Sequence, residues 1–115
     1  KIYAAFDALK KGDGTDEHFD YLAAAINVSF FRAQDISPTL VEQLQHAQDA
    51  MTACGRRMQQ HGKSGFSGPE MQHVALAIEA HEEILRHSTP IQMWRALRKV
   101  QDNYRAARAK QGGGQ

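Results

Sequence analysis

The residues best suited to chemistry lie on one predicted helix, which follows Ser67 and ends near Leu85. Glu70 and His73 are three positions apart, the spacing with which di-iron carboxylate bundles bind metal, and His81 lies about two turns further along. Such a site also needs a second Glu-x-x-His and two more inward-facing glutamates. The sequence contains no second Glu-x-x-His. We therefore predict no metal site and no cofactor, and we expect His81 to be a partly buried side chain.

Nucleophilic catalysis also has little support in the sequence. The single cysteine, Cys54, falls in an apolar pattern typical of a small core residue, and one cysteine cannot form an intramolecular disulfide. The serines at positions 37 and 67 precede predicted helices, where they serve as N-caps. Gly62-Lys63-Ser64 resembles part of a phosphate-binding loop, but that motif needs a glycine where Arg57 stands and a strand before it. We predict that the chain is not an enzyme.

The elements that must position these residues are all predicted to be helices. A short helix at the N-terminus ends at Gly12-Asp13-Gly14, and capping residues begin four longer helices after Thr15, Ser37, Ser67 and Thr89. Alternation with a period of two is never sustained, so no strand is expected. The sequence predicts an all-α fold, a compact antiparallel helical bundle of four main helices plus a short N-terminal helix. We expect residues 1–105 to form the domain. The last helix should end near Tyr104, and residues 106–115 should form a flexible basic and glycine-rich tail.

Two apolar patterns on these helices bear on possible partners. In the third helix, apolar residues recur in steps of four and three, as in antiparallel bundles: Leu40, Leu44, Ala47, Met51, Cys54 and Met58. This seam can pack inside the bundle or face a second copy, which makes a homodimer one expected assembly. On the last helix, five residues follow one side, which we expect to face the core: Ile91, Trp94, Leu97, Gln101 and Tyr104.

Charge is distributed unevenly along the chain. Residues 86–115 carry seven basic side chains and one acidic one, a net charge of +6, whereas residues 1–85 carry seven basic and twelve acidic ones, a net charge of −5. Away from its predicted apolar side, the last helix presents five cations that we predict as partner-binding residues: Arg95, Arg98, Lys99, Arg105 and Arg108. They suit an acidic protein surface or a nucleic-acid backbone. Packing beside the acidic helices, with local neutralisation, is the alternative.

Nucleic acid is the less favoured of the two partners. Binding of single strands relies on exposed aromatic rings that stack on bases, and the pattern assigns Trp94 and Tyr104 to the core. No helix-turn-helix or zinc-finger pattern is present. No apolar run reaches the length of a membrane span, so we expect no membrane partner.

Four short stretches are distinctive in combination. They are Gly14-Thr15-Asp16, Ala25-Ile26-Asn27, Gly68-Pro69-Glu70-Met71-Gln72 and Glu79-Ala80-His81-Glu82. Together they resemble a family of small proteins encoded by bacteriophages and prophages of proteobacteria, over residues 3–100. The resemblance brings no catalytic or binding residues with it. It implies a small non-enzymatic accessory protein in the host cytoplasm that binds a host protein and inhibits a host defence or regulatory factor.

Overall fold

The computed structural model describes residues 2–62 and 65–113, with side chains up to Lys110. It contains five helices and, within the described residues, no strand. The helices are α1 (Ile2–Lys11), α2 (Asp16–Ala33), α3 (Pro38–His61), α4 (Gly68–Arg86) and α5 (Pro90–Gly113). The prediction of an all-α helical bundle is confirmed. Lys63 and Ser64, which belong to the phosphate-loop-like stretch, lie outside the described residues.

The long helices begin at the predicted capping residues. The Ser67 hydroxyl accepts the Glu70 N–H, and the Glu70 carboxylate accepts the Ser67 N–H, which completes a capping box. Thr15 and His18 form the equivalent box at α2, with the imidazole in place of the usual glutamate. Ser37 caps α3, and Thr89 caps α5 together with Gln92. Local hydrogen bonding therefore fixes these starts.

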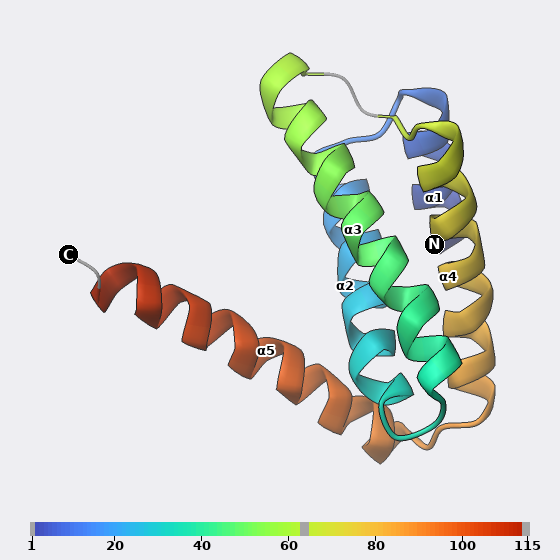
Figure 1. Ribbon diagram of the computed structural model, residues 1–115, viewed down its shortest axis with the longest axis vertical. Helices are drawn as coiled ribbons and strands as arrows, with labels where there is room; N and C mark the ends of the chain where they lie inside the picture. The colour runs from blue at the N-terminus through green and yellow to red at the C-terminus, as the bar shows by residue number, and fades with distance from the viewer. Residues whose placement is uncertain (1, 63–64, 114–115) are drawn as a thin grey trace.

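Helices α1 to α4 form a closed body. Helix α3 runs antiparallel to α2, and α4 runs antiparallel to α3 (Figure 1). Helix α1 packs against α2 and α4. The core contains apolar residues from all four helices, including Leu9, Leu22, Ile26, Leu44, Val74 and Ile78. Burial of this apolar surface is the main force that holds the body together.

The seam predicted on α3 lies inside this body. Leu44, Ala47, Met51 and Cys54 are buried, and the residues at its two ends pack against the core. The expectation that this seam can face a second copy is therefore wrong, because its side chains are already covered. A homodimer stays a prediction, but it would need another surface.

Helix α5 departs from the predicted bundle. It packs principally against α2 and then leaves the body at a steep angle (Figure 1). The helix was expected to end near Tyr104, yet it continues to Gly113, so residues 106–113 of the predicted flexible tail are helical. The reason lies in the sequence Arg-Ala-Ala-Arg-Ala-Lys, which consists of strong helix formers and reaches no glycine before position 112.

Candidate binding surfaces on the last helix

The apolar side predicted for α5 faces solvent rather than the core. Ile91 is 62% exposed, Trp94 56% and Leu97 41%, and Tyr104 further along is 61% exposed. The residues that pack towards α2 are the smaller ones, with Ala96 and Val100 buried and Met93 partly buried. The core prediction was therefore wrong for Ile91, Trp94, Leu97 and Tyr104. We call Ile91, Trp94 and Leu97 the outer stripe.

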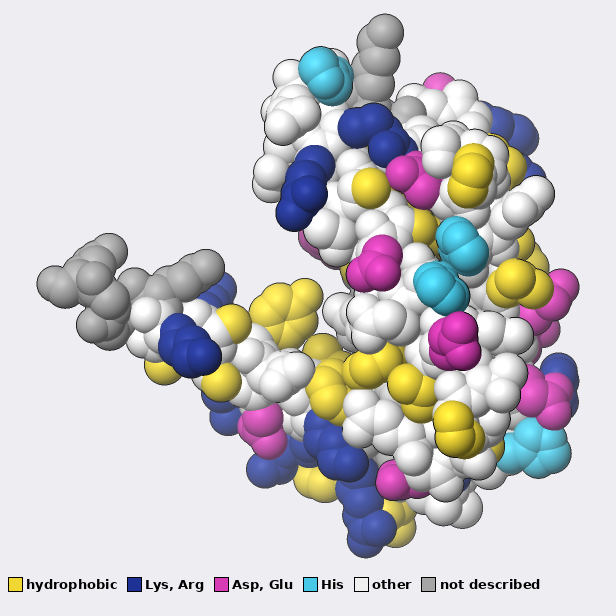
Figure 2. Space-filling view, viewed as in Figure 1, with side chains coloured by type: hydrophobic (Ala, Val, Ile, Leu, Met, Phe, Trp, Pro, Cys, Tyr) yellow, Lys and Arg dark blue, Asp and Glu magenta, His cyan; other side chains and the backbone are white. Residues whose placement is uncertain are grey.

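Cations are mixed with the outer stripe. The Arg98 guanidinium carbon lies 5.1 Å from the centroid of the Trp94 ring, a cation–π contact. Arg105 follows Arg98 by seven residues, or two turns, and so lies on the same side of the helix. Figure 2 shows hydrophobic and basic side chains side by side along this helix. The prediction that the cations lie away from the apolar side was thus wrong for Arg98 and Arg105.

Arg95 and Lys99 belong to a separate hollow where α5 meets the end of α2. They line a space of about 310 Å³ together with Arg32, Asp35, Phe31, Gln92 and Ala96. Three cations and one carboxylate surround this space, which we call the basic hollow. Arg95 and Lys99 were predicted from the sequence as binding residues, and Arg32 was not. The available signal was a lone arginine beside Ala33 in the apolar pattern of α2.

Arg32 is the unusual member of the basic hollow. Its side chain is buried, with 8% of the residue exposed, and its Nε donates a 2.9 Å hydrogen bond to the Ser88 hydroxyl. Among the described residues, no carboxylate lies within 4 Å of its guanidinium as an ion pair. The fifth predicted cation, Arg108, is exposed on the projecting half of α5.

A third feature is the open angle between α5 and the body. Phe30 of α2, Gln48 of α3 and Tyr104 of α5 help to line a hollow of about 350 Å³ at this angle. Tyr104 also borders an adjoining hollow of about 440 Å³ along the crease between α2 and α3. The exposed Tyr104 residue therefore borders both hollows.

The three residues considered as metal ligands each contact a different protein group. Glu70 forms an ion pair with Arg57, His73 stacks on His46 with ring centroids 5.0 Å apart, and His81 Nδ1 lies 2.6 Å from the Ser29 hydroxyl. Within the part of the chain that the structure describes, no three metal-binding side chains converge. Burial lowers the pKa of His81, against the opposing effect of Glu82, so the imidazole is neutral at pH 7.

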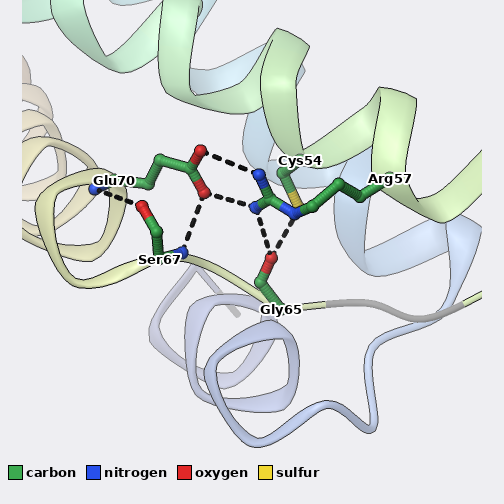
Figure 3. A network of polar contacts seen from close by, with 5 residues as sticks. All are labelled: Cys54, Arg57, Gly65, Ser67 and Glu70. Carbon is green, nitrogen blue, oxygen red and sulfur yellow. Dashed lines mark hydrogen bonds and ion pairs between the residues drawn. The ribbon is translucent and has the colours of Figure 1, made fainter.

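The Glu70 pair anchors a polar network between α3 and the start of α4 (Figure 3). Arg57 Nη1 donates to Glu70 at 2.9 Å, and Nη2 donates to both Glu70 and the Gly65 carbonyl oxygen. The Cys54 thiol also donates to that carbonyl, and burial raises the pKa of the thiol. A buried, protonated thiol is a poor nucleophile. The network connects Gly65 and the start of α4 to α3.

No known protein family, curated protein or solved structure matches this chain. The phage-family resemblance therefore stays a prediction. None of the described helices combines the length and apolar character that crossing a membrane requires.

Proposed function

We propose that the chain is a protein-binding module whose contact surface is the outer stripe of α5. The observation that supports this proposal is that Ile91, Trp94 and Leu97 lie exposed in one row on a helix that packs principally on α2. Single exposed apolar residues are common on proteins, but a contiguous row with a large aromatic ring marks an interaction surface. Tryptophan and arginine are also the residues most enriched at the energetic centres of protein interfaces.

The chemistry of the stripe indicates the kind of partner. Trp94 and Leu97 suit an apolar pocket or groove, and Arg98 and Arg105 beside them suit an acidic rim. The partner is therefore a protein with an apolar depression bordered by carboxylates. The phage resemblance implies that this partner is a host defence or regulatory factor. The prediction from the sequence that the chain is not an enzyme is consistent with a binding role.

Nucleic acid is the second candidate, and one observation favours it. Nucleic acid was the less favoured partner because the apolar pattern assigned Trp94 and Tyr104 to the core, yet both rings are exposed. Exposed aromatic rings among arginines are the arrangement with which proteins bind single strands. Such binding weakens steeply with salt, whereas burial of the outer stripe against a protein depends on salt much less.

The test uses two leucines with similar exposure on different helices. Leu97 of α5 is 41% exposed and Leu76 of α4 is 45% exposed. The tagged chain captures proteins from a nuclease-treated host lysate, and the recovered protein is purified and titrated against the wild type, Leu97→Ser and Leu76→Ser. We expect Leu97→Ser to weaken binding about tenfold, the loss of roughly 1.4 kcal/mol at an interface, and Leu76→Ser to leave it unchanged.

Two results would contradict the proposal. Equal effects of Leu97→Ser and Leu76→Ser would show that the outer stripe is not the contact surface. Capture that disappears with nuclease, together with salt-sensitive binding of single-stranded DNA that Trp94→Ser abolishes, would instead support the nucleic-acid candidate.

A further inference from the structure

The basic hollow contains a buried positive charge, that of Arg32, which forms no ion pair with the described residues. Arg32 is more than nine-tenths buried, its one hydrogen bond to a described group goes to Ser88 through Nε, and no ion pair to it is found among the described residues. A guanidinium has five N–H donors, and a buried charge is costly unless it is paired. The described protein groups thus leave the two terminal nitrogens of Arg32 available to solvent or to a bound anion.

The surroundings of the two terminal nitrogens of Arg32 follow from the hydrogen bonds of the described residues. Among the described residues, no fully buried side-chain nitrogen lacks a hydrogen-bond partner. Since the two terminal nitrogens of Arg32 bind no described group, they reach solvent, and we infer that they do so in the basic hollow, because Arg32 lines it. The planar pair of terminal nitrogens matches two oxygens of a phosphate or carboxylate.

Two further cations lie around the same space. Arg95 and Lys99 come from α5, four residues apart and therefore on one side of the helix, and both line the hollow opposite the end of α2. The four charged groups, with Asp35 as the acid, give a net charge of +2. At about 310 Å³ the space is at the small end of ligand sites, so it suits a small anion rather than a large cofactor.

We propose that the basic hollow binds a phosphate group, held by Arg32, Arg95 and Lys99. Asp35 makes the choice between oxyanions specific. An ionised carboxylate can only accept hydrogen bonds, so it favours an anion that carries a proton. Every inorganic phosphate ion carries at least one proton near neutral pH. A phosphate monoester carries one on a fraction of molecules, because its second pKa is close to 6, whereas sulfate has none to donate. The site therefore selects phosphate over sulfate.

This site is independent of the proposed protein contact. The basic hollow uses Arg95 and Lys99, whereas the outer stripe uses Trp94 and Leu97 with Arg98 beside them. Ile91 of the outer stripe lies one turn before Arg95, so the two surfaces adjoin, but they share no residue. A variant can therefore lose one of them and retain the other.

The test is calorimetric titration of the full chain at constant ionic strength and pH 7, with inorganic phosphate, glycerol 3-phosphate and sulfate as separate probes. The variants Arg95→Gln and Lys99→Gln each remove one exposed cation of the hollow, so neither is expected to unfold the chain. Arg98→Gln and Arg105→Gln remove the same charge from the same helix outside the hollow. We expect each hollow variant to weaken phosphate binding about tenfold, the loss of a charge-assisted hydrogen bond, and the controls to change it less than twofold.

The probes also identify the source of the phosphate. Tighter binding of glycerol 3-phosphate than of inorganic phosphate, with the same dependence on Arg95 and Lys99, supports the site and assigns it to a phosphate monoester. The reverse order supports the site and assigns it to free phosphate. Asp35→Asn should narrow the preference for phosphate over sulfate.

Three outcomes overturn the proposal. The first is no binding of either phosphate probe. The second is equal binding of phosphate and sulfate by the wild type. The third is an equal loss for Arg95→Gln and Arg98→Gln, which would show that general positive charge on α5, and not the hollow, attracts the anion.

Discussion

The closed body of α1 to α4 and the projecting helix α5 bury their side chains in different ways. In the body, the apolar side of each helix meets another helix, and Leu44 and Ile78 are almost completely inaccessible. In α5, the small residues Ala96 and Val100 pack on α2 while the larger Trp94 and Leu97 remain in solvent. The comparison shows that α5 packs through small side chains and leaves its largest apolar side chains exposed, whereas the core of the body is filled by large ones.

The largest expected difference is in stability. Ile78→Ala removes a fully buried side chain and should lower the free energy of unfolding by about 2–5 kcal/mol. Leu97→Ala removes a similar side chain from the outer stripe and should change it by less than about 0.5 kcal/mol. Urea unfolding followed by circular dichroism measures both. Similar losses for the two variants would mean that Leu97 packs on the body.

The sequence predicted the body better than α5 for a physical reason. The starts at Thr15, Ser37, Ser67 and Thr89 depend on hydrogen bonds within one turn, so local sequence determines them. Helix α5 has two apolar sides, one of large residues and one of small residues. Which side packs depends on how closely α5 approaches α2, and this is a tertiary property.

The basic hollow was only half predictable for the same reason. The clustering of Arg95 and Lys99 is visible in the sequence as excess charge on one helix. Arg32 is more than sixty positions away in the chain, and it joins them only because the end of α2 crosses the start of α5. No spacing rule for one helix could have brought these three residues together.

A smaller effect is expected at the polar network that closes the body. The hydrogen bonds from Arg57, and those from Ser67, hold the pKa of Glu70 below its ordinary value, although burial opposes this. The ionised carboxylate therefore stabilises the fold above the unfolded pKa near 4.3, and this contribution is lost as the pH falls through the lower folded pKa. Glu70→Gln should cost roughly 1 kcal/mol at pH 7 and reduce the acid dependence of stability.

Glu79→Gln provides the control for this pH effect. Glu79 lies on the same helix and is exposed. Thermal unfolding at pH 7 and at pH 3 should distinguish the two variants. A Glu70→Gln protein that loses as much stability on acidification as the wild type would contradict the role given to the Arg57 pair.

The smallest predicted effect concerns His81 in the middle of the body. Burial lowers the pKa of its imidazole in the folded state, so the unfolded chain binds a proton more readily. The free energy of unfolding should therefore be greatest above the unfolded pKa near 6.5 and decline as the pH falls from there towards the folded pKa. His81→Gln should remove this decline, and the exposed His61→Gln should retain it. Urea midpoints at pH 7.5 and 5.5 measure the difference.

The central claim is that the outer stripe of α5 is exposed in the free chain, and Trp94 reports on it directly because it is the only tryptophan. The measurement is Trp94 fluorescence with acrylamide quenching, at a dilution where light scattering shows a monomer. The account predicts an emission maximum typical of tryptophan in water and efficient quenching by acrylamide. Addition of the protein partner should shift the emission to shorter wavelength and make the quenching less efficient. Blue-shifted emission that resists quenching in the free monomer would contradict it, because Trp94 would then be packed against the body.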